Sequence, residues 1–102
     1  MNFEELLNRG YKEYNPPPLS NAHRICQKRF DDGNGNKLYF ISVYLYTWDG
    51  SDRYEAHIQL YQKGTHYPLD LNFFDGWNID DVEKYANSIY HIEQFEPYER
   101  SI

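Results

Sequence analysis

Only one cysteine, Cys26, occurs in the chain of 102 residues, so a disulfide within one chain is excluded. A lone thiol is typical of proteins in a reducing compartment. No hydrophobic run is longer than a strand, so we expect no membrane-spanning helix. The first residues, with Glu4 and Glu5, lack the apolar centre of a signal peptide. These absences together predict a cytoplasmic protein.

The sequence also lacks the patterns of the common metal, cofactor and catalytic sites. Its four histidines, His23, His57, His66 and His91, show no metal-ligand spacing, and no HExxH or CxxC motif occurs. No glycine-rich phosphate loop or dinucleotide fingerprint is present. Residues 31–36 carry oxygen ligands suited to calcium, but their glycines do not fit the EF-hand order and favour a turn. We therefore predict no metal, no cofactor and no assigned catalytic residue.

Charge and aromatic content narrow the class of partner. The formal net charge is −6, and an acidic domain is repelled by phosphate backbones. A nucleic-acid partner is therefore disfavoured, whereas a basic protein partner and an ordinary acidic surface both stay open. Aromatic residues make up 19% of the chain, a share that excludes a disordered protein. The length fits one domain spanning residues 1–102.

Hydrophobic periodicity predicts several antiparallel strands. Residues 38–48 alternate between an aliphatic and an aromatic row, and residues 53–63 alternate between apolar and polar side chains. A further strand over 66–74 contains Pro68, which cannot donate to a ladder, so we expect it at an edge. The alternation over 23–30 is weak, and the sequence leaves open whether these residues form a strand.

Two helices are expected near the ends of the chain. Residues 2–9 place their apolar side chains at helical spacing on one face. Residues 79–91 show the pattern of a second helix, with Asp80 at the N-cap and Glu83 three positions later, as in a capping box. The predicted fold is a two-layer α+β domain, in which a three- or four-stranded antiparallel meander carries both helices on one face. Its order is α-(β)-β-β-β-α.

The remaining segments and the core follow from this arrangement. We expect residues 11–22 to form a proline-rich connector and residues 94–102 a loosely structured tail. The side chains predicted to fill the core are Ile41, Val43, Leu45, Ile58, Leu60, Leu69, Leu71, Val82 and Ile89.

The hairpin turns bring aromatic and polar side chains together on the sheet face opposite the helices. With Gly50-Ser51 as the first loop, Trp48 lies opposite Arg53, and the following turn places His57 opposite Asn72. The predicted partner-binding surface consists of Tyr44, Tyr46, Trp48, Arg53, His57, Gln59, Tyr61 and Asn72.

Aromatic rings and arginine among polar groups are typical of protein-binding hot spots. We therefore predict a non-enzymatic domain that binds another protein or forms a homo-oligomer. By analogy alone, we expect an accessory or inhibitor role like that of small proteins from phages and other mobile elements. Two plainer interpretations stay open: the rings only cover the sheet backbone, or the tail or a second protomer packs on them. The alternative function is a small enzyme or ligand-binding domain centred on His57, beside Glu55.

Overall fold

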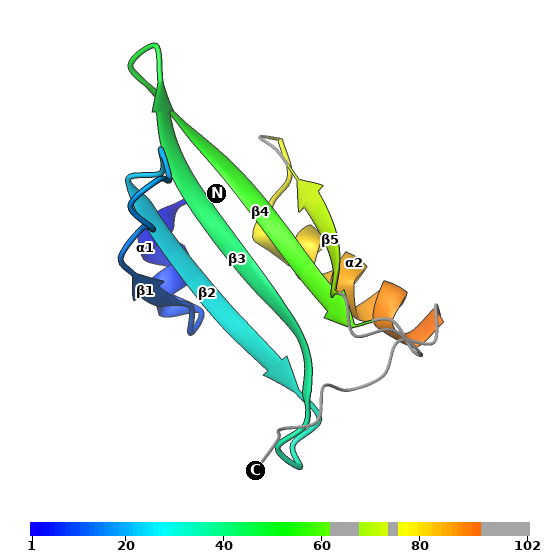
Figure 1. Cartoon of the computed structure of the whole chain (residues 1–102). Coiled ribbons are helices and arrows are strands. Elements are labelled where there is room, and N and C mark those ends of the chain that lie inside the picture. Colours follow the sequence, from blue (N-terminus) through cyan, green and yellow to red (C-terminus); the bar gives the residue numbers. More distant parts are fainter. Residues whose placement is uncertain (62–67, 74–75, 93–102) are drawn as a thin grey trace.

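The computed structural model describes residues 1–61, 68–73 and 76–92 (Figure 1). Its strands form one five-stranded antiparallel sheet in the order β1-β2-β3-β4-β5, so sequence neighbours are also neighbours in the sheet. One short helix precedes the sheet and a longer helix follows it. The elements are α1 (Phe3–Asn8), β1 (Lys12–Tyr14), β2 (Arg24–Asp31), β3 (Lys37–Trp48), β4 (Ser51–Tyr61), β5 (Pro68–Phe73) and α2 (Ile79–Ile92).

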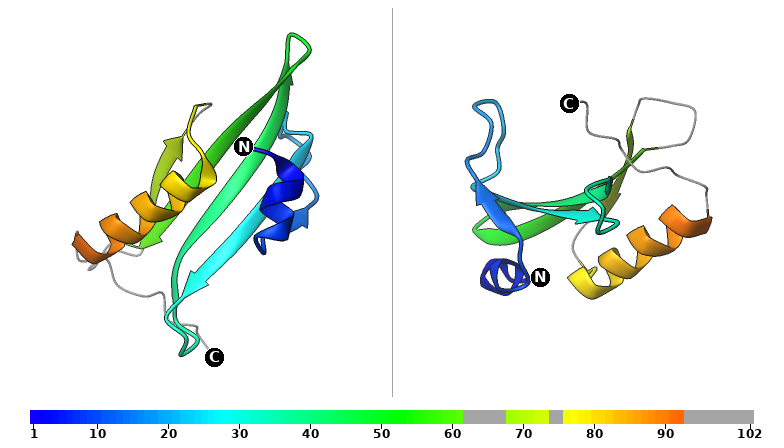
Figure 2. Two further views of the ribbon diagram at one scale, coloured as in Figure 1. Left: turned by 180° about the vertical axis from the view of Figure 1, so that it is seen from behind. Right: turned by 90° about the horizontal axis from the view of Figure 1, so that it is seen from below.

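Both helices lie against one face of the sheet, which we call the inner face (Figure 2). The opposite face, the outer face, is covered by neither of them. The predicted two-layer α+β arrangement is therefore confirmed, although the sheet has five strands instead of three or four. Within the described ranges, every helix is too short or too polar to cross a membrane.

Two strands, β1 and β2, precede the three strands that the sequence predicts over residues 38–74. The segment left open by the sequence is β2, which pairs with β3 from Arg24↔Leu45 to Asp31↔Lys37. The sequence does not predict β1, which lies inside the expected connector 11–22. Its three residues are all exposed and pair only with residues 25–27 of β2. A strand with no buried side chain leaves no hydrophobic alternation to detect. The expected tail, 94–102, lies outside the described residues.

The core fills the space between the inner face and the helices. Alternation along β3 and β4 places aliphatic side chains inward, as predicted, and α1 and α2 contribute apolar side chains from the helix layer. Of the predicted core residues, Ile41, Val43, Leu45, Ile58, Leu60 and Val82 are buried, Leu71 and Ile89 are partly buried, and the Leu69 side chain lies outside the described part. The aliphatic face was therefore assigned correctly.

The turn between β3 and β4 corrects the predicted register. Asp49 and Gly50 form the two-residue loop, with φ of 50° and 76°. Positive φ at both positions is the mark of a type I′ turn, which favours Asp-Gly. Trp48 therefore lies opposite Ser51, and Arg53 lies opposite Tyr46. The prediction of Gly50-Ser51 was wrong by one residue, so the pairs shift by two. Because the shift is even, every side chain keeps its face.

The pairing of β4 with β5 agrees with the predicted register. His57 lies opposite Asn72 and Gln59 lies opposite Asp70. The turn expected between these strands, Gly64-Thr65, falls outside the described residues.

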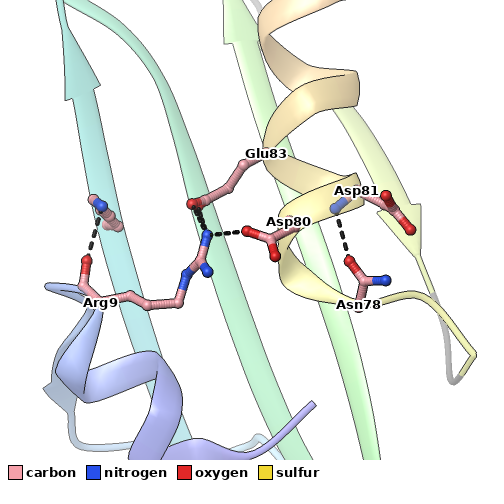
Figure 3. A network of polar contacts seen from close by, with 6 residues as sticks. Arg9, Asn78, Asp80, Asp81 and Glu83 are labelled. Carbon is pink, nitrogen blue, oxygen red and sulfur yellow. Dashed lines mark hydrogen bonds and ion pairs between the residues drawn. The ribbon is translucent and has the colours of Figure 1, made fainter.

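The start of α2 differs from the predicted cap. The side chain of Asn78, and not that of Asp80, accepts a hydrogen bond from the backbone N–H of Asp81 at 2.9 Å. The carboxylates of Asp80 and Glu83 are instead 2.7 and 2.9 Å from Nη2 of Arg9 (Figure 3). Arg9 directly follows α1, so this ion pair joins the two helices across the inner face.

Candidate functional site

The strands β3 and β4 extend beyond their neighbours at the turn that joins them (Figure 1). The pairing of β2 with β3 reaches only Leu45, and the pairing of β4 with β5 reaches only Ala56. In the described part of the sheet, residues 46–55 therefore have strand partners only within β3 and β4. We call this two-stranded extension the hairpin arm. Because its end extends past the neighbouring strands, residues 47–53 are all exposed.

Apart from Tyr61, the side chains predicted to bind a partner lie on the outer face, as the observed pairing of β3, β4 and β5 requires. Trp48 is 67% exposed, and Arg53 and Asn72 are also exposed. Tyr44, Tyr46, His57 and Gln59 are half-buried. The side chain of Tyr61 lies outside the described part. Exposure thus increases along β3 toward the tip of the hairpin arm.

The half-buried rings contact one another in a row. The ring centroids of Tyr44 and Tyr46 lie 6.3 Å apart, with the ring planes inclined by 20°. The rings of His57 and Tyr44 form a T-shaped pair with a centroid distance of 4.8 Å. Burial raises the pKa of the Tyr46 phenol, and the negative charge of Glu55 raises it further. Tyr46 is therefore a neutral hydrogen-bonding phenol at physiological pH.

A hollow of about 570 Å³ opens on the arm beside Trp48. Its lining residues are Asn21, Tyr46, Thr47, Trp48, Arg53 and Glu55. Asn21 comes from the loop between β1 and β2, which rises on the outer side of the sheet (Figure 2). The sequence did not identify Asn21, because its position beside β3 depends on the pairing of β2 with β3. The structure thus gathers three of the predicted surface residues around one depression.

His57 and Glu55 form a pair of the kind that serves in acid–base catalysis. Its Nε2 lies 2.6 Å from Oε1 of Glu55, and both side chains are largely shielded from solvent. Ser42 lies directly opposite His57 on β3, and its Oγ accepts a hydrogen bond from Gln27. The sequence did not identify Ser42, because the predicted loop placed Tyr44 and not Ser42 opposite His57. The hollow on the arm is lined by Glu55 and not by His57 or Ser42.

The other chemical groups of the described residues give no comparable site. Cys26 is fully buried, and burial raises the pKa of its thiol to about 12, so the thiol is protonated at neutral pH. In the ranges that the structure describes, no group of three or more His, Cys, Asp or Glu side chains could hold a metal ion. The outer face and its arm remain the best-defined candidate.

The chain matches no protein-family model, no curated protein and no solved structure. The geometry of the outer face and its arm is therefore the main indication of function.

Proposed function

We propose that this protein is a non-enzymatic domain that binds another protein through the outer side of its hairpin arm. The observation that carries the proposal is Trp48, which is 67% exposed and lies beside a hollow of about 570 Å³. Tryptophan, tyrosine and arginine are the residues most enriched in binding hot spots, and here Trp48, Tyr46 and Arg53 line the same depression.

The energetics of folding support this assignment. Trp48 is absent from the core cluster, so the fold gains little from a large ring at this position. A contiguous exposed apolar patch often marks an interaction site, and Trp48 shares its hollow with Tyr46, which stacks on Tyr44. The partly buried Tyr44 and Tyr46 would hold the surface in place, and Trp48 would supply the area that a partner covers. An accessory or inhibitor role in the cytoplasm fits the single buried thiol.

Photo-crosslinking in the native cells tests this proposal. A benzophenone amino acid replaces Trp48 in one variant and Tyr85, which is 43% exposed on α2, in the control variant. We expect the probe at position 48 to form an adduct with a second polypeptide, and the probe at position 85 not to form that adduct. Equal labelling from both positions, or none from position 48, would contradict the proposal.

The affinity for the captured protein gives the quantitative test. Truncation of a hot-spot ring typically weakens binding about thirtyfold, so we expect this loss for Trp48→Ala and a similar loss for Tyr46→Ala. Tyr85→Ala should leave the affinity within about twofold. Circular dichroism and urea titration of each variant separate lost contact from lost folding.

A second candidate function is acid–base catalysis at His57. The specific observation in its favour is the 2.6 Å contact with Glu55, which would orient the imidazole. Hydrolysis of a panel of activated esters tests it. A rate above that of free imidazole that disappears in His57→Gln, with the fold retained, would support catalysis. A rate equal in the variant and the wild type would exclude it.

A further inference from the structure

The charges of the hairpin arm are unevenly balanced. Between residues 46 and 55 stand the carboxylates of Asp49, Asp52 and Glu55, against the single cation Arg53. Asp49 is exposed in the turn that follows Trp48, and Asp52 is exposed opposite Thr47, on the other side of the thin two-stranded arm from Trp48. The arm that carries the exposed indole therefore has an excess of negative charge.

Cations lie over aromatic rings elsewhere in the molecule. The guanidinium carbon of Arg24 is 3.9 Å from the ring centroid of Phe3, and Nζ of Lys37 is 4.2 Å from that of Phe40. Indole attracts cations more strongly than phenyl does. Yet in the described part of the chain no lysine or arginine lies over Trp48. Among the described residues, the exposed indole of Trp48 is thus not covered by a cation.

We propose that the partner of the hairpin arm presents a basic segment, with an arginine or lysine side chain over Trp48 and its charge facing Asp49 and Glu55. This inference rests on the proposed function and names the chemistry of the partner. Charge complementarity favours this occupant, because two copies of a chain of net charge −6 repel each other. The same carboxylates repel the phosphates of a nucleic acid.

Titration with synthetic peptides tests the inference directly. Trp77→Phe leaves Trp48 as the only tryptophan, so the fluorescence change reports the arm. The probes are three short Gly-Ser peptides of equal length that carry evenly spaced arginine, lysine or glutamate. We expect the arginine and lysine peptides to change Trp48 emission and the glutamate peptide to leave it unchanged. An increase from about 0.05 to about 0.5 M salt should weaken binding about tenfold, because screening shortens the reach of the carboxylates.

Matched variants separate the local charge from the net charge. Asp49→Asn with Glu55→Gln should weaken binding of the arginine peptide about fivefold to tenfold, which corresponds to two lost partly exposed charge contacts. Glu5→Gln with Asp81→Asn removes the same charge from the helices and should change it less than twofold. Asparagine is tolerated at the positive φ of position 49, so the turn is retained.

Several results would overturn the inference. These are binding of none of the peptides, equal binding of the glutamate peptide, or equal losses in the two double variants. Preference for a single-stranded oligonucleotide, or a dimer in sedimentation that Trp48→Ala abolishes, would assign a different occupant. Crosslinking from position 48 to an acidic segment of a protein would refute the basic partner and leave the proposed function standing. The absence of any protein adduct would instead remove the proposed function itself.

Discussion

Truncation of Ile58 tests the division of the sheet into a core face and a contact face. Ile58 is fully buried at the centre of β4, between its partners Ile41 on β3 and Leu71 on β5. Ile58→Ala removes three buried carbon atoms, each contributing about 0.8 kcal/mol of transfer free energy. The residual cavity adds to this, so we expect a loss of about 3–4 kcal/mol in the free energy of unfolding. A domain of this length has about 5–15 kcal/mol in total, so the variant should fold but unfold much earlier.

Urea denaturation followed by far-ultraviolet circular dichroism measures this loss. Leu19→Ala is the matched control, because it also removes three carbon atoms but from a side chain that is 99% exposed. We expect a change below about 0.5 kcal/mol for the control, with an unchanged denaturant slope in both variants. A loss below about 0.5 kcal/mol in Ile58→Ala, or equal losses in both variants, would refute the assignment of the inner face.

Three further outcomes follow from the buried polar groups. Burial raises the pKa of Tyr39 and of Cys26 to about 12. In alkaline solution below that pH, the folded protein therefore keeps two protons that the unfolded chain releases. These two groups should therefore make stability decrease from about pH 9 toward pH 12, and a flat profile in alkaline urea titrations would contradict this. Glu83→Gln weakens the ion pair with Arg9 and should cost about 1–3 kcal/mol in urea titrations, whereas no loss would show that the helices need no such link. The Tyr11 hydroxyl is buried without a hydrogen-bond partner in the described residues, so Tyr11→Phe should not lower the melting temperature, and a clear decrease would reveal a missing partner.

The faces of the long strands could be predicted from the sequence because alternation survives small errors of register. The loop was placed at Gly50-Ser51 instead of Asp49-Gly50, since both dipeptides contain a glycine suited to a tight turn. The resulting error of two residues moved Arg53 from Trp48 to Tyr46, yet all three stayed on the outer face. Which side chains share a face was therefore predictable, and which of them touch was not.

The features that the sequence did not predict depend on contacts between distant segments. The strand β1 exists because β2 offers it a free edge, and its own residues are all exposed. Asp80 and Glu83 have the spacing of a capping box, but Arg9 lies close enough in space to engage both carboxylates. Asn78 then caps the helix. Local spacing could not reveal this competition, because the competing group is 74 residues away in sequence from Glu83.

The graded burial along β3 links the fold to the proposed contact surface. Binding is strongest when the contact groups lose little conformational freedom, which requires that neighbours already hold them in place. Tyr44 lies over the body of the sheet, where the His57 ring contacts it, and it stacks on Tyr46 at the base of the arm. Tyr46 in turn lines the hollow with Trp48. The partly buried rings thus limit the motion of the arm at its base. The indole at its end stays exposed, and a partner would cover that surface.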